Sequence, residues 1–153
     1  MFAVLTLDGC LADSSPKAGE WLAGTDTAER FGVADMKGTA RPLDENAPLT
    51  LLSGWVKDSP AHSVYLIEAT TVTAGIINGM LRFRQVDEII LCTIPVIAGN
   101  GCRLFQSDLP ANGWTCRAVK AYKDGALKAV YQRKDGASVQ KMNTSPLKRL
   151  FRK

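Results

Sequence analysis

Residues 86–105 read VDEIILCTIPVIAGNGCRLF, and this stretch decides the fold class of the chain. Its centre, Ile89 to Ile94, is a short apolar run rich in β-branched residues, which is typical of a strand buried on both faces of an α/β sheet. Pro95 ends the run because proline cannot donate to a strand ladder. Gly99 and Gly101 follow, and glycine permits positive φ and a close approach of backbone to a ligand. A core strand with an ordinary exit loop is the alternative that the pattern leaves open.

The length and composition of the chain indicate one soluble domain. It has 153 residues, of which 46% are hydrophobic and 22% are charged, as in ordinary globular proteins. No apolar run reaches the roughly 18 residues that a membrane-spanning helix needs. The apolar start is too short for a signal peptide and is interpreted as a first strand. We therefore expect a cytoplasmic protein without a membrane partner.

Cysteine and histidine usage argues against a metal site. The four cysteines, at positions 10, 92, 102 and 116, have no C-x-x-C spacing, and His62 is the only histidine. We expect buried free thiols and no metal. The single histidine also makes a Ser-His-Asp or Cys-His hydrolase a poor hypothesis.

Charge is distributed unevenly along the chain. Residues 1–116 carry 8 Lys and Arg against 13 Asp and Glu, a balance of −5, whereas residues 117–153 carry 11 against 2, a balance of +9. A basic segment suits nucleic acid, an anionic cofactor or an acidic partner, and it is also compatible with a solvated polar face and a tail. It lacks the interleaved aromatic residues of a single-strand platform, so a nucleic-acid partner is not expected.

Apolar runs and turn signals predict the other strands. They are residues 2–7, 49–53 and 64–68, and a hairpin of 116–122 and 126–133 around Lys123-Asp124-Gly125. The order of elements indicates an α/β domain with a mixed, mainly parallel sheet, helices on both faces and an antiparallel C-terminal hairpin. Strands 2–7 and 89–94 are expected to be central.

Helical patterns occur in three places. Thr25 is predicted to be the N-cap of a short helix, and residues 70–75 open a longer helix that continues through Arg84. Ser145 and Pro146 open a third, inside a basic C-terminal extension of residues 135–153 that follows a domain of residues 1–134. Residues 9–20 are expected to be a flexible lip, and 36–46 an irregular surface segment.

Four stretches, in order, resemble the dihydrofolate-reductase superfamily. The branch they are most similar to is the pyrimidine reductase of riboflavin biosynthesis and its small stand-alone relatives. The stretches are Leu5-Thr6-Leu7-Asp8-Gly9 with Ala12-Asp13 and Trp21; Arg41-Pro42-Leu43 with residues 49–53; residues 86–105; and residues 114–133. The resemblance implies a dihydrofolate-reductase-like α/β fold.

The resemblance also implies an activity: NADPH-dependent hydride transfer to a C=N or C=O group of a pterin- or pyrimidine-like heterocycle. The residues it marks as catalytic are Asp26 and Asp8, and those it marks as substrate-binding are Thr6, Trp21 and Asp26. An apolar groove around Asp26 would raise the pKa of its carboxyl and suit proton relay. The alternative is that Asp26 simply lies at the start of a helix, where the helix dipole favours an acid.

NADPH is the cofactor that the resemblance implies. The expected contacts are Gly9, Lys37, Gly38, Thr39, Ser53, Thr73, Ala74, Gly75, Gly99, Asn100 and Gly101. One departure from the family is important. After the strand that ends at Ile67, family members carry a Gly-Gly pair whose backbone opposes the cofactor pyrophosphate, whereas this chain has Glu68-Ala69-Thr70-Thr71. The alternative function is therefore a non-catalytic member of the fold, with a weakened or lost cofactor site and a binding or structural role.

Relatives in this branch pair through their sheets, so the resemblance implies a homodimer. The C-terminal hairpin would otherwise leave an exposed edge. Leu147, Leu150 and Phe151 share one face of the predicted terminal helix, which must dock on something to be stable. Packing of that helix on its own subunit is the alternative.

Overall fold

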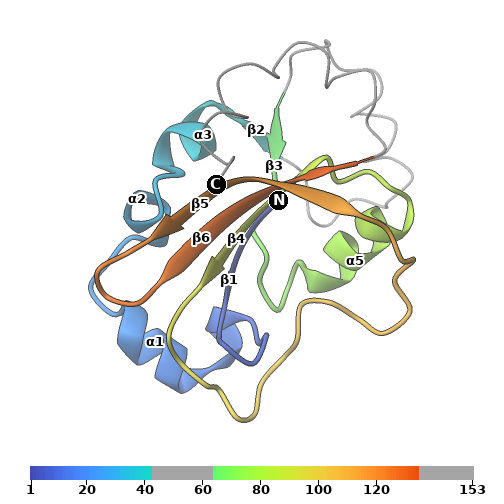
Figure 1. The fold of residues 1–153 in the computed structure, drawn as a ribbon. Coiled ribbons are helices and arrows are strands. Elements are labelled where there is room, and N and C mark those ends of the chain that lie inside the picture. Colours follow the sequence, from blue (N-terminus) through green and yellow to red (C-terminus); the bar gives the residue numbers. More distant parts are fainter. Residues whose placement is uncertain (43–63, 135–153) are drawn as a thin grey trace, which may run out of the picture.

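The structure, a computed structural model, describes residues 1–42 and 64–134. It is a mixed α/β domain with a four-stranded sheet of order β1-β4-β6-β5 and a separate two-stranded sheet of β2 and β3 (Figure 1). In chain order the elements are β1 (Phe2–Leu5), η1 (Ala12–Ser14), α1 (Pro16–Leu22), α2 (Thr27–Arg30), α3 (Ala34–Thr39), β2 (Arg41–Pro42), β3 (Tyr65–Leu66), α5 (Ala74–Arg82), β4 (Glu88–Thr93), β5 (Trp114–Ala121) and β6 (Leu127–Arg133).

Strands β1 and β4 form the parallel pair of the four-stranded sheet. They pair in register from Phe2 opposite Ile90 to Leu5 opposite Thr93. The other edge of β1 is also bonded, because Phe2 N donates to Ile67 O at 2.9 Å and Ala69 N donates to Phe2 O at 2.8 Å. Isolated bridges from Phe2 to Glu68 and from Leu5 to Leu11 are the further pairings of β1. The 89–94 strand is therefore central as expected, whereas the first strand is a buried strand at the end of the four-stranded sheet.

The C-terminal hairpin completes the sheet with antiparallel pairs. β6 lies between β4 and β5, so β5 forms the outer edge of the four-stranded sheet. At the turn, Asp124 Oδ1 accepts a hydrogen bond from Ala126 N at 3.1 Å, and Gly125 has φ +97°, a value that favours glycine. The Asp-Gly prediction of this hairpin is confirmed.

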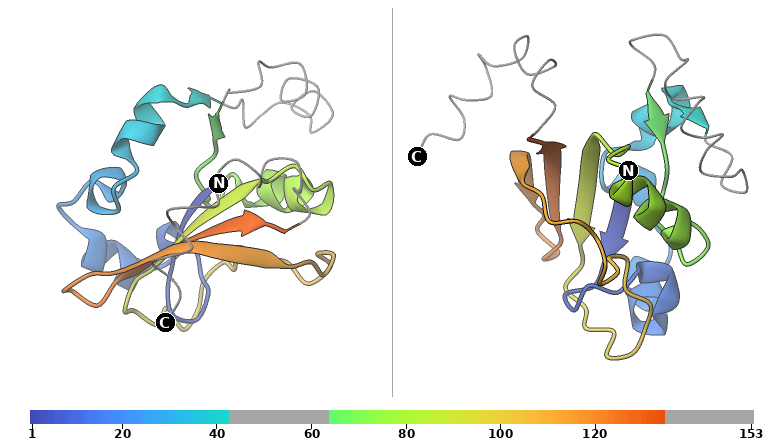
Figure 2. Two further views of the ribbon diagram at one scale, coloured as in Figure 1. Left: turned by 45° about the horizontal axis from the view of Figure 1, so that its top comes forward. Right: turned by 90° about the vertical axis from the view of Figure 1, so that its right-hand side faces the viewer.

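The period-2 alternation of β1 divides the core into two layers. Ala3 and Leu5 pack in one cluster with Ile77 and Met80 of α5. Phe2 and Val4 pack in the other, which holds Ala18 of α1, Ala28 of α2 and Phe31. Figure 2 shows α5 on one side of the strands and α1 to α3 on the other. Both faces of the β1–β4 pair are thus covered.

Three sequence predictions for the first 42 residues are wrong. The expected flexible lip contains η1 and α1, where Ser15 Oγ accepts from Ala18 N at 3.2 Å and Pro16 occupies the first turn. The N-cap of α2 is Asp26 rather than Thr25. The segment expected to be irregular from residue 36 contains most of α3 and then β2. In each case a short helix carries too few residues for a clear hydrophobic period.

Several expectations fall outside the described residues. These are the strand 49–53 with Ser53, and the C-terminal extension 135–153 with its helix. In the part of the chain that is described, no helix is long and apolar enough to cross a membrane. The cysteines are free, with Cys10 and Cys92 buried but Cys102 and Cys116 exposed, so the expectation of buried thiols is right for only half of them.

Candidate functional site

Asp8 organises the loop at the carboxyl ends of β1 and β4. Its carboxylate accepts hydrogen bonds from Thr6 Oγ1 at 2.6 Å, from Ala98 N at 3.0 Å and from Gly99 N at 3.0 Å. The Thr6 hydroxyl is the largest of the influences that lower the pKa of Asp8 to about 2. Asp8 is therefore ionised near neutral pH and holds a loop, which does not suit it to donate a proton.

The rest of this loop is bonded to the segment before α1. Leu11 N donates to Cys102 O at 2.7 Å, and Ser14 Oγ accepts from Cys102 N at 2.9 Å. A Cβ at Gly101 would lie 2.9 Å from Ser14 Oγ, and Gly99 has φ +73°. Close packing against Ser14 thus accounts for Gly101, and positive φ accounts for Gly99, which are two of the five glycines that the sequence marked as cofactor contacts.

Trp21 and Asp26 lie in different surroundings from those expected. The Arg30 guanidinium covers one face of the half-buried Trp21 ring at 4.2 Å from the centroid. Asp26 is exposed, and its Oδ1 accepts from Ala28 N at 3.0 Å as the cap of α2. No hydrogen bond in the described part of the chain joins Asp26 to Asp8 or to Trp21. The exposed cap corresponds to the alternative that the sequence left open, and a catalytic role for Asp26 stays a prediction.

Threonine side chains close the turn that precedes α5. Thr70 Oγ1 accepts from Val72 N and from Thr73 N, each at 3.2 Å. Thr73 Oγ1 accepts from Thr70 N at 2.8 Å and donates to Glu68 O at 2.6 Å. The backbone N–H groups of residues 70, 72 and 73 therefore all have acceptors inside the segment.

The remaining N–H group of residues 70–73, that of Thr71, donates to the carboxylate of Asp13 in η1. Its Oδ2 accepts from Thr71 N and from Thr71 Oγ1, both at 2.9 Å. The carboxylate thus lies at the amino end of α5, where the helix dipole favours a negative charge. The sequence analysis noted Asp13 only as part of the family resemblance, because no local pattern connects it to a partner 58 residues away.

The candidate cation and hydroxyl of α3 are also engaged. Lys37 Nζ lies 3.6 Å from the Glu68 carboxylate, and both side chains are well exposed, so the pair is weak. Thr39 Oγ1 donates to Asp35 O at 3.0 Å within its own helix. Neither group is held ready for a phosphate.

The predicted cofactor contacts thus divide into three places. Gly9 and residues 99–101 lie beside the ends of β1 and β4, residues 73–75 open α5, and residues 37–39 belong to α3. Ser53 lies outside the described residues. Within residues 1–42 and 64–134, no group of three His, Cys, Asp or Glu side chains is placed to hold a metal ion.

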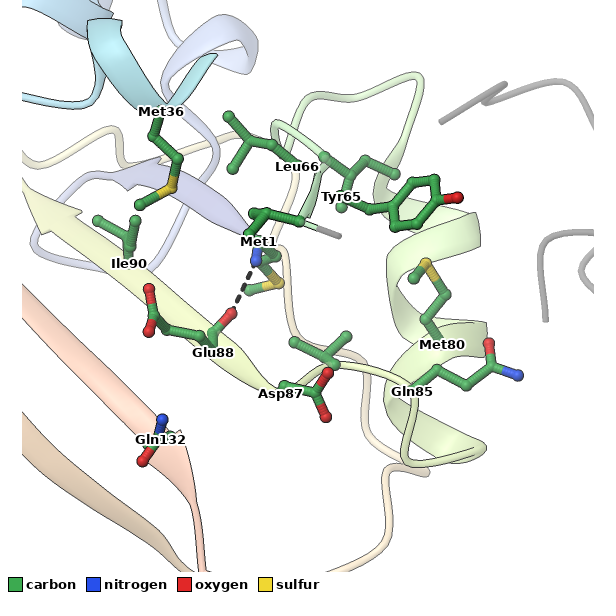
Figure 3. Close-up of a pocket in the computed structure, with 13 residues that line it drawn as sticks. Met1, Met36, Tyr65, Leu66, Met80, Gln85, Asp87, Glu88, Ile90 and Gln132 are labelled. Atoms are coloured by element: carbon green, nitrogen blue, oxygen red, sulfur yellow. Dashed lines mark hydrogen bonds between the residues drawn. The ribbon is translucent and has the colours of Figure 1, made fainter. Parts of the chain in front are cut away.

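A cavity of about 340 Å³ lies at the opposite, amino ends of β1 and β4 (Figure 3). Its walls come from β3, β4, β6, α3 and α5 together with the residue before β1. They are formed by Met1, Met36, Val64, Tyr65, Leu66, Ile67, Met80, Gln85, Val86, Asp87, Glu88, Ile90 and Gln132. Sequence analysis did not predict it, because its wall residues come from six separate stretches.

Comparison with known proteins identifies the fold. No family model and no curated protein matches the chain. A solved riboflavin-biosynthesis protein from a Shewanella species matches with a TM-score of 0.50 and 18% identity, over 87% of this chain and 97% of that one. RibD of Acinetobacter baumannii matches with a TM-score of 0.56 and 13% identity, over 86% of this chain and 56% of that one. The chain has a dihydrofolate-reductase-like fold. The resemblance stated from the sequence is confirmed at the level of fold.

The turn before α5, residues 70–73, does not fit a dinucleotide pyrophosphate. A phosphate bound at a helix N-terminus needs free N–H donors and a favourable potential. Here the N–H groups of residues 70–73 are bonded internally, and the Asp13 carboxylate already lies against Thr71. A phosphate would have to displace these acceptors and would meet a like charge.

Proposed function

We propose that this protein is a non-catalytic member of the reductase fold that binds a small molecule without a dinucleotide cofactor. The observation that carries the proposal is the closed turn directly before α5. The four N–H groups of residues 70 to 73 in this turn are all bonded within the chain, and one of them is bonded to the Asp13 carboxylate.

The energetic reason is that an incoming phosphate gains little here. Opening the site breaks two hydrogen bonds from Thr71 to Asp13, each worth about 1 kcal/mol, and leaves the carboxylate close to the phosphate. Like charges in contact oppose binding. Lys37, the candidate counter-charge, is paired with Glu68.

An NADPH-dependent reductase of a pterin- or pyrimidine-like heterocycle is the second candidate. The observation that favours it is the ordered loop of Asp8 and Gly99 at the carboxyl ends of β1 and β4, where open α/β sheets bind ligands. When bound, NADPH would supply the hydride. The chain's own part would be to orient the substrate near Thr6 and Trp21, with Asp26 as the predicted proton source.

One experiment separates the two candidates. The purified full chain is mixed with NADPH, and the cofactor's fluorescence and its absorbance at the reduced-nicotinamide band are followed with and without dihydrofolate or a pyrimidine substrate. The first candidate predicts no saturable fluorescence change and no oxidation. Saturable binding with substrate-dependent oxidation would establish the second.

We also propose that the protein is a cytoplasmic homodimer. The outer edge of the four-stranded sheet is β5, and Val119 on that strand is 58% exposed. Natural proteins normally protect an exposed strand edge by pairing it, covering it or placing charges on it. A partner copy would cover it.

A further inference from the structure

We infer that the cavity at the amino ends of β1 and β4 binds a small planar organic cation of the amidine, guanidine or protonated amino-heterocycle class. This gives the proposed binding function a site and a ligand class. The cavity lies at the opposite end of β1 and β4 from the Asp8 loop, so the test below does not depend on NADPH.

The size and walls of the cavity suit a small ligand. Its volume of about 340 Å³ falls within the range of about 300–1,000 Å³ that is usual for ligand sites. The apolar wall is firmly packed, since Met1 is 8% exposed, Met80 is 5% exposed and Ile90 is 3% exposed. Val86 and Ile67 extend the same surface. The pocket is therefore preformed.

Three methionines from separate elements surround the space. Met1 precedes β1, Met36 belongs to α3 and Met80 belongs to α5, and Figure 3 shows them approaching the cavity from different directions. Thioether sulfurs make favourable contacts with aromatic rings, and flexible methionine side chains adapt to a flat ligand. The apolar part of the cavity therefore favours an aromatic body.

The polar part of the cavity is acidic. Asp87 and Glu88 line it, whereas neither lysine nor arginine does. The Asp87 carboxylate is paired with Arg133 at 3.1 Å, whereas Glu88 forms no salt bridge with a residue that the structure describes and interacts electrostatically with the amino group of Met1. The amino group of Met1 donates to the backbone oxygen of Glu88 at 2.7 Å, not to its carboxylate (Figure 3). Burial lowers the pKa of that amino group, and the nearby carboxylates of Glu88 and Asp87 act in the opposite direction.

Glu88 and Gln132 together form a polar edge beside the apolar wall. They are directly opposed in the register of β4 and β6, so their side chains lie on one face of the sheet, and Ile90 shares that face. Neither side chain makes a hydrogen bond to a residue that the structure describes. A carboxylate accepts two parallel N–H bonds, and an amide adds a further acceptor, which is the arrangement that an amidine or guanidine edge needs.

Benzamidine and its neutral analogue benzamide test this inference. The full chain is labelled at the methionine methyl carbons, and each compound is titrated while the methyl resonances are followed. We expect benzamidine to shift the resonances of Met1, Met36 and Met80 at millimolar concentration, and benzamide to bind more weakly. Glu88→Gln should weaken benzamidine binding by roughly 10-fold or more, because it removes a charge-assisted hydrogen bond. Glu20→Gln, on the exposed side of α1, should leave it unchanged.

Three outcomes would overturn the inference. They are equal affinity for benzamidine and benzamide in the unaltered protein, shifts confined to Met142, and benzamidine affinity that survives Glu88→Gln. The comparison of the two compounds needs no variant, so it decides the question even where the substitution disturbs folding. Failure here leaves the NADPH result untouched, so the two proposals fail separately.

Discussion

Asp13 and Thr71 are 58 residues apart in the chain, yet one carboxylate oxygen of Asp13 accepts hydrogen bonds from both the backbone nitrogen and the hydroxyl of Thr71 at 2.9 Å. This contact joins the segment before α1 to the start of α5. It puts a side-chain anion of the protein where a phosphate would otherwise meet the helix.

Replacing Asp13 should loosen the start of α5. Asp13→Ala removes two hydrogen bonds and a charge that is favourable at a helix N-terminus, so we expect a loss of about 1–2 kcal/mol in the free energy of unfolding. Amide hydrogen exchange at Thr71 should accelerate. Chemical denaturation and exchange measurements check both effects, and Asp35→Ala, an exposed acid on α3, is the matched control. Unchanged exchange at Thr71 would show that the contact is not maintained in solution.

Asp8 should make stability depend on acid pH. Its pKa falls from 3.8 to about 2 in the folded protein, chiefly through the Thr6 hydroxyl. Because the folded pKa is the lower one, the stabilisation is present above about pH 4 and is lost as pH falls toward 2. We expect the Tm of the natural protein to fall over this window and that of Asp8→Asn to fall less. Parallel curves for the two proteins, in thermal unfolding at several pH values, would contradict the account.

The fold could be predicted from the sequence wherever a local pattern determined an element. The β-branched run predicted β4, the Asp-Gly pair predicted the β5–β6 hairpin, and the helical spacing after residue 75 predicted α5. The Ser15-Pro16 pair is itself a helix-start signal, but it was attributed to a loop because α1 is only seven residues long.

The candidate site was less predictable, since its decisive contacts join distant parts of the chain. Asp13 and Thr71 carry no shared motif, and Ser14 meets Cys102 across 88 residues. The glycines at 99 and 101 were assigned to a cofactor, although the bonds of Asp8 and the packing of Ser14 explain them. The absence of a Gly-Gly pair after Ile67 was noted in the sequence. It falls just before residues 70–73, whose N–H groups are hydrogen-bonded within the chain.

Two variants of Asp26 distinguish its role as a helix cap from the role of a catalytic acid. As a cap it can be replaced by asparagine, which accepts the same hydrogen bond from Ala28 N, whereas Asp26→Ala should cost about 1 kcal/mol in unfolding free energy. Urea denaturation of the two variants measures this. In the reductase candidate, by contrast, Asp26→Asn would lower the turnover rate, chiefly at higher pH where a proton must be relayed. An Asn variant as destabilised as the Ala variant would count against the capping role.

The outer edge of the sheet predicts a homodimer. Light scattering at micromolar concentration should report twice the monomer mass, because a stable symmetric interface of roughly 800 Å² per partner would cover β5. Val119→Lys should shift the equilibrium toward monomer, while Thr115→Lys, also exposed and nearer the start of β5, serves as the comparison. A purely monomeric natural protein would refute the dimer.

Isothermal titration of NADPH into the unaltered full chain is the most direct test of the central claim, that the turn before α5 is closed to a dinucleotide phosphate. The account predicts no saturable heat at cofactor concentrations up to the millimolar range. It also predicts a gain of binding to inorganic phosphate or NADPH in Asp13→Ala, where the Thr71 donors are freed. Saturable micromolar binding of NADPH by the unaltered protein would contradict it.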